Sequence, residues 1–104
     1  MTLSSINQEA INKNLNRITN QIYKLLPNRE EGIDWEKPLQ TLIIELTGMA
    51  SLIKDQVELF SLLCKLEALK TLKEESNFPL YRKTIFECLG LMDVIKQNVT
   101  TKQS

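Results

Sequence analysis

The chain has 104 residues, with 13 basic and 13 acidic side chains, two cysteines and no histidine. This length suits one domain of ordinary size, and we expect a single helical domain over residues 1–104. Histidine is the commonest acid–base catalyst and a common metal ligand, so its absence argues against most such chemistry. A net charge of 0 argues against a chain that mainly coats nucleic acid or a membrane surface.

The apolar stretches and the cysteines predict a cytoplasmic protein. The N-terminus lacks the basic and apolar regions of a secretory signal, and no window of about 18 residues is apolar enough to span a membrane. Cys64 and Cys88 stand apart in apolar runs without C-x-x-C spacing, which favours two reduced, buried thiols. We therefore expect no membrane association and no cofactor. The excess of Lys over Arg and the many Ile and Asn residues are typical of an AT-rich genome, such as that of a low-GC bacterium or its phages and plasmids.

Apolar residues recur at alternating steps of three and four in four segments, which predicts an all-α fold. This spacing is typical of the left-handed packing found in four-helix bundles. We expect a small antiparallel four-helix bundle with helices near residues 5–26, 35–54, 56–74 and 78–99 and a polar tail at 100–104. Gly48 and Gly90 fall inside the helical patterns, and we expect each to let a neighbouring helix approach closely.

Residues that cap or break helices stand at several of the predicted ends. Ser5 followed by Gln8 has the pattern of a capping box at the start of the first helix. Pro27 is expected to end that helix, because proline removes a backbone donor and clashes with the preceding turn. Asp34 is placed to cap the second helix with its carboxylate.

The boundary between the second and third helices is the least marked. No Gly or Pro separates Ile53 from Val57, so a single continuous helix through residue 74 is one alternative. At about 100° per residue, the apolar stripes on the two sides of this point face nearly opposite directions. That change of direction favours a break near Lys54 and Asp55.

The third helix carries two apolar stripes. Its leucines form one, and Val57, Phe60, Cys64 and Ala68 form a second stripe on the opposite side. A helix that is apolar on two sides is buried on two sides. Since each helix of a four-helix monomer keeps one face in water, we expect the second stripe to bind another copy, most simply in a homodimer. The alternative is an apolar core helix within a monomer.

The connection between the first two helices combines the chain's one tryptophan with paired charges. Tryptophan and arginine are the residue types that most often anchor interfaces, which makes this loop a candidate for binding a protein partner. The candidate residues are Arg29, Glu30, Glu31, Asp34 and Trp35. The structural alternative is that Ile33 and Trp35 pack over the end of the bundle while the charges cap helix ends.

The acidic part of this loop also resembles a metal-binding motif. Glu30, Glu31 and Asp34 have the E-E-x-x-E/D spacing with which helical nucleotide pyrophosphatases hold Mg²⁺. However, Pro27 and Gly32 bracket the segment, so its carboxylates are not expected to share a helix face. Mg²⁺ needs several converging oxygens, and the sequence has no second acidic motif that could supply the remaining ligands.

A small basic face on the first helix is the one signal for nucleic acid. Lys13, Arg17 and Lys24 lie within about 40° of one another, opposite the apolar seam. Three cations would release few counterions, so any binding would be weak and strongly salt-dependent. A solvated helix face is the simpler interpretation.

These features favour a protein that binds over one that catalyses. We expect a non-enzymatic interaction module that self-associates through the third helix, such as an adaptor, a regulator or inhibitor, or a small structural subunit. The alternative is a small helical subunit of a nucleoprotein complex, which would contact the nucleic-acid backbone through the basic face. A Mg²⁺-dependent nucleotide hydrolase is a distant third. We expect no catalytic and no metal-binding residues.

Overall fold

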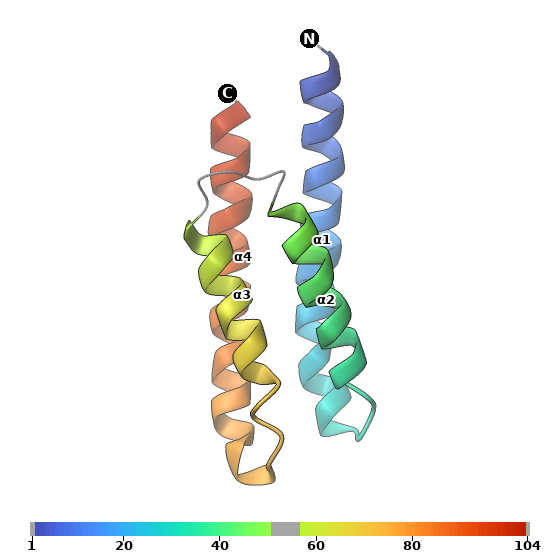
Figure 1. Cartoon of the computed structure of the whole chain (residues 1–104), viewed down its shortest axis with the longest axis vertical. Coiled ribbons are helices and arrows are strands. Elements are labelled where there is room, and N and C mark those ends of the chain that lie inside the picture. The colour runs from blue at the N-terminus through green and yellow to red at the C-terminus, as the bar shows by residue number, and fades with distance from the viewer. Residues whose placement is uncertain (1, 51–56, 104) are drawn as a thin grey trace.

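The computed structural model describes residues 2–50 and 57–103, and its side chains from residue 9 to residue 98 outside the gap (Figure 1). This part of the chain is all helical and contains no strand. Its elements are the α-helices α1 (Thr2–Glu30), α2 (Glu36–Met49), α3 (Val57–Leu69) and α4 (Phe78–Gln103), with the short 3₁₀ helix η1 (Glu75–Asn77) before α4.

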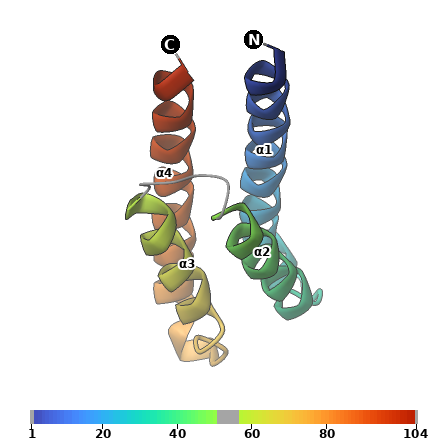
Figure 2. The ribbon, with the colours of Figure 1, turned by 45° about the horizontal axis from the view of Figure 1, so that its top comes forward.

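The two long helices lie behind the two short ones (Figures 1 and 2). Each helix contacts two others: α1 contacts α2 and α4, and α3 contacts α2 and α4. Both termini lie at one end of the molecule, which measures 51 × 22 × 18 Å. With 29 and 26 residues, α1 and α4 are about twice as long as α2 and α3 and extend beyond them at this end.

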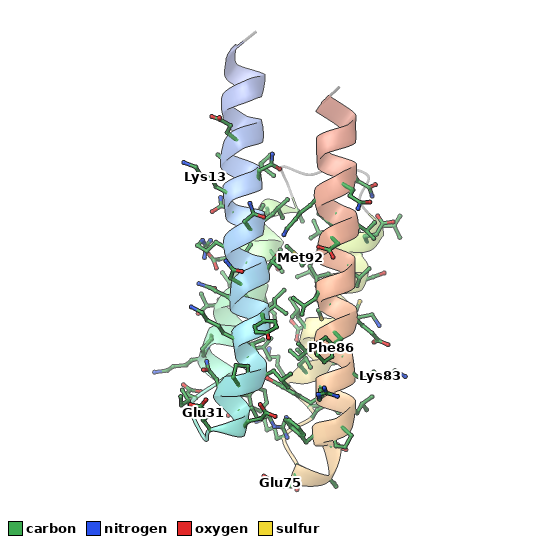
Figure 3. All side chains as sticks on the ribbon, turned by 180° about the vertical axis from the view of Figure 1, so that it is seen from behind. Lys13, Glu31, Glu75, Lys83, Phe86 and Met92 are labelled. Carbon is green, nitrogen blue, oxygen red and sulfur yellow. The ribbon has the colours of Figure 1, made fainter. Side chains whose placement is uncertain are left out.

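The apolar residues at the predicted spacing of three and four form the core. In α1 the buried side chains are Leu15, Ile18, Ile22 and Leu25. The other three α-helices contribute Leu39, Leu42, Ile43, Leu46, Met49, Leu59, Leu62, Leu66, Leu69, Tyr81, Ile85, Cys88, Met92 and Ile95. Figure 3 shows Met92 pointing into the space between the long helices. The periodicity therefore identified the buried face of each helix.

The sequence predicted that the first helix stops at Pro27, and this prediction is wrong. The helix begins at Thr2, before Ser5, and continues through Pro27 to Glu30. Pro27 removes the hydrogen bond to the carbonyl of Tyr23 and crowds that carbonyl, but it stands in the last turn, where only three helical residues follow it. The helix is terminated by Gly32, whose φ of 75° is the left-handed conformation that favours glycine. The amide of Ile33 then donates to the carbonyl of Asn28 at 2.7 Å, which closes the turn.

The third helix is shorter and the fourth longer than predicted. Helix α3 was predicted to continue to residue 74 but ends at Leu69. The amides of residues 70–72 form i→i−3 hydrogen bonds instead of α-helical ones, such as Leu72 N to Leu69 O at 3.1 Å. In contrast, α4 continues through the predicted polar tail to Gln103. Nothing in residues 100–103 breaks a helix, since they contain neither proline nor glycine.

The second and third helices are separate. Helix α2 ends at Met49 and packs beside α3, which begins at Val57, so one continuous helix is excluded. The predicted break at Lys54 and Asp55 lies outside the described residues.

The two glycines inside helices do not admit a neighbouring helix, contrary to expectation. A Cβ atom built on Gly48 or Gly90 would have nothing within 4 Å. Both positions are exposed on the helix surface, where glycine only weakens the helix.

Candidate interaction surfaces

The end of α1 is tied to the connection between α3 and α4 by one side chain, Arg29. Its guanidinium donates to the carbonyl of Leu72 through Nη1, and through Nη2 to the carbonyls of Lys73 at 3.2 Å and Glu74 at 2.9 Å. Three consecutive carbonyls that have left α3 are thereby satisfied by one charged donor. This contact holds the segment that follows α3 against the end of α1.

Aromatic rings surround the same guanidinium. The Cζ atom of Arg29 lies 4.4 Å from the ring centre of Tyr81, 5.0 Å from that of Trp35 and 5.5 Å from that of Phe78. Trp35 and Tyr81 meet edge to face with their centres 5.0 Å apart. The Tyr81 hydroxyl donates to the carbonyl of Leu25 at 3.4 Å, and its burial raises the pKa of the phenol. We call Arg29, Trp35, Phe78 and Tyr81 the arginine clasp.

The other predicted loop residues do not gather with the clasp into one exposed patch. Asp34 accepts hydrogen bonds from the amides of Glu36 at 3.0 Å and Lys37 at 3.4 Å, and so caps α2 as expected. Glu30 is the last residue of α1, and Glu31 follows it, exposed at the end of the molecule (Figure 3). Arg29, Asp34 and Trp35 thus have internal roles, as in the structural alternative, whereas Ile33 is 49% exposed and does not join the core as that alternative expected.

The second apolar stripe of α3 is exposed. Val57 is 72% and Phe60 68% exposed, and Cys64 and Ala68 are exposed as well. The opposite side of the same helix is fully packed, since Leu62, Leu66 and Leu69 are all 0% exposed. Burial of this stripe in the chain's own core is therefore not observed. We call Val57, Phe60, Cys64 and Ala68 the outer stripe of α3.

The charged residues beside the outer stripe are paired within the chain. Lys65 reaches Glu87 of α4 at 3.0 Å, and Lys70 reaches Glu67 at 3.3 Å. Glu58 accepts a hydrogen bond from Asn98 of α4 at 3.4 Å. The stripe is thus an uncharged surface whose neighbouring lysines are paired, while Glu58 keeps its negative charge at the border.

The basic face of α1 is smaller than the sequence suggested. The Nη2 atom of Arg17 lies 2.6 Å from a carboxylate oxygen of Glu45 on α2, and this hydrogen bond raises the pKa of the guanidinium. Lys13 and Lys24 are exposed, and Figure 3 shows Lys13 on the side of α1 away from α4. Helix packing therefore neutralises one of the three cations.

A shallow hollow adjoins this face between α1 and α2. It has a volume of about 290 Å³ and is lined by Gln21, Lys24, Asn28, Pro38 and Thr41. One cation and two amide side chains among open walls do not enclose a ligand as binding sites usually do.

The two cysteines differ sharply in accessibility. Cys64 lies exposed on the outer stripe, whereas Cys88 is 0% exposed, so the prediction of two buried thiols holds for Cys88 alone. Burial raises the pKa of the Cys88 thiol to about 12, which keeps it protonated and unreactive. Among the described residues, no three His, Cys, Asp or Glu side chains are grouped to hold a metal ion. No helix in this part of the chain is long and apolar enough to cross a membrane.

Five large apolar residues outside the predicted surfaces are exposed, and the sequence analysis missed them. Ile44 on α2 is 62% exposed and Tyr23 on α1 59%, while α4 carries Leu80 at 51%, Phe86 at 47% and Val94 at 39%. Phe86 lies on the rear face, where Arg82 stacks over its ring at 5.2 Å (Figure 3). Tyr23 and Ile44 each stand alone, away from the buried stripe of their helix, so the three-and-four spacing gave no signal for them.

Comparison with known proteins adds no relative. No protein-family model, no curated protein and no solved structure matches the chain. The surfaces described above are therefore the basis for inferring the function of the protein.

Proposed function

We propose that this protein is a non-enzymatic interaction module that works as a homodimer formed through the outer stripe of α3. In this proposal the chain folds as an antiparallel four-helix bundle in the cytoplasm and serves a larger assembly as an adaptor, a regulator or a structural subunit. The contacts of each helix with two neighbours, and the termini at one end, support the bundle interpretation.

The observation that carries the proposal is the two-sided character of α3. Its inner side is packed to 0% exposure at three leucines, while Phe60 on its outer side remains 68% exposed. Aromatic residues at the centre of an uncharged patch are typical of interface anchors. Leaving such side chains in water forfeits roughly 1.5–3 kcal/mol each, which burial against a second copy would recover in part.

The alternatives have less support from the described residues. For the nucleoprotein alternative, the pairing of Arg17 with Glu45 leaves only Lys13 and Lys24 to meet phosphates. For the Mg²⁺-dependent hydrolase, Glu30 ends α1 and Asp34 is engaged as the cap of α2, so the two do not share a helix face.

The mass of the chain in solution tests the proposal. We expect light scattering to give a dimer of the 12.0 kDa chain, and we expect Phe60→Ser to shift it toward the monomer without loss of helix by circular dichroism. Phe86→Ser is the matched control, because Phe86 is also an exposed phenylalanine but lies on α4 at the rear. A wild-type chain that stays monomeric at every concentration would refute the proposal.

A further inference from the structure

Ile44 lies on the outer side of α2, displaced toward α3. At about 100° per residue, it stands roughly 160° from the centre of the buried stripe of this helix. Glu45 marks the side of α2 that faces α1, through its ion pair with Arg17. Ile44 therefore faces outward from the molecule and is rotated slightly toward α3, away from the side that faces α1.

Phe60 occupies the corresponding position on α3, displaced toward α2. Lys65 and Glu58 mark the side of α3 that faces α4, because their partners Glu87 and Asn98 belong to α4. Phe60 lies roughly 140° from the centre of the buried stripe, on the side away from these two residues. Helices α2 and α3 contact each other and together form the front of the molecule (Figures 1 and 2). Their exposed apolar residues therefore belong to one continuous face.

The outer stripe of α3 alone is too small for a stable dimer. A fully exposed phenylalanine presents roughly 150–250 Å², so four residues of which two are small offer on the order of 300–400 Å² per copy. A stable interface buries roughly 800 Å² per partner. The outer side of α2 is of similar length, with 14 residues against 13, and adds Ile44 and the exposed polar side chains of Lys37, Gln40 and Thr41, so its inclusion increases the area toward this requirement.

From this geometry we infer that the second copy docks across both short helices, with Ile44 and Phe60 in the same interface. The inference rests on the self-association proposed above and adds α2 to it. A second copy fits this face because the net charge of 0 creates no repulsion between copies. The neighbouring charges Lys65, Glu67 and Lys70 are paired within the chain, and the charges that remain on the described part of this face, Lys37 on α2 and Glu58 on α3, have opposite signs, so the face carries no excess of one sign.

The test compares the effects on dimer stability of replacing two exposed isoleucines, Ile44 and Ile33. Sedimentation equilibrium is used to measure the dimer dissociation constant of the full chain and of Ile44→Ser, Ile33→Ser and Phe60→Ser. Ile33 is the matched control, since it is 49% exposed in the α1–α2 connection at the end of the molecule. We expect Ile44→Ser and Phe60→Ser each to raise the dissociation constant by about tenfold or more, and Ile33→Ser to leave it within about twofold.

The possible results separate this inference from the proposed function. If Phe60→Ser weakens the dimer and Ile44→Ser does not, the interface is confined to α3; the inference is then wrong while the proposed function stands. If the wild-type chain is monomeric at every concentration, both are wrong. Circular dichroism confirms that each variant retains its helix content, which is expected because all three side chains are exposed.

Discussion

Arg29 shows how one side chain can hold the segment that follows a helix. Its guanidinium donates to the carbonyls of residues 72–74, which lie 43 to 45 positions further along the chain. Because arginine binds these carbonyls, they are satisfied outside an α-helix. The planar fork of arginine can donate to several acceptors while it stacks on aromatic rings, which lysine cannot do.

Replacing Arg29 by lysine is therefore expected to destabilise the protein. We expect Arg29→Lys to lower the free energy of unfolding by about 1–3 kcal/mol, since it leaves carbonyls partly unsatisfied and removes the stacking on Tyr81 and Trp35. Urea unfolding followed by the fluorescence of Trp35, the single tryptophan, measures this change. Arg82→Lys is the control: Arg82 is exposed and stacks on Phe86 alone, so its loss is expected to cost under about 0.5 kcal/mol. Equal effects of the two variants would contradict a structural role for the clasp.

The clasp also marks the limit of what the sequence could predict at this scale. The residue types singled out Arg29 and Trp35, but as anchors for a partner rather than as internal contacts. Their neighbours Tyr81 and Phe78 come from α4, and no local pattern connects them with the α1–α2 connection. The cap provided by Asp34 was predictable because it involves only the next three residues.

At the scale of helices, local signals located the elements better than their ends. The spacing of apolar residues predicted four helices and their buried sides, because burial selects every third or fourth residue. Helix ends were less predictable: Pro27 is tolerated in a last turn, and Gly32 supplies the actual stop. The exposure of the outer stripe was predictable too, since its residues repeat at helical spacing.

The two helix glycines provide a test at this scale. We expect Gly90→Ala and Gly48→Ala each to raise the free energy of unfolding by about 0.5–1 kcal/mol, because alanine restricts the unfolded chain and meets nothing within 4 Å in the folded chain. Thermal or urea unfolding in the monomeric Phe60→Ser background measures the gain without a contribution from dimer formation. Destabilisation by either alanine would mean that a helix approaches the glycine more closely than the structure describes.

At the scale of the whole molecule, helix packing redistributes the charges that the sequence presents separately. Arg17 pairs with Glu45 and Lys65 with Glu87 between helices, and Lys73 joins the α3–α4 connection to Glu36 of α2 at 3.0 Å. Such exposed pairs contribute little stability individually, about 0–1 kcal/mol each. Their effect is on recognition, because they pair most of the charges beside the α2–α3 face and leave only Lys37 and Glu58, which have opposite signs, without an ion pair among the residues described there. A surface of this kind favours apolar association over attraction to a polyanion.

Cys64 offers a built-in probe of that association. It lies on the outer stripe, whereas Cys88 is 0% exposed with a pKa raised by burial to about 12, so a maleimide at neutral pH should modify one thiol per folded chain. Since a second copy would cover Cys64, we expect the rate constant of its alkylation to fall as the protein concentration passes through the dimer dissociation constant. Mass spectrometry after timed quenching measures this rate. In Phe60→Ser the rate should be independent of concentration over the same range. If the mass doubles while the alkylation rate of Cys64 stays constant, the copies associate through another surface, such as the rear face that carries Tyr23 and Phe86.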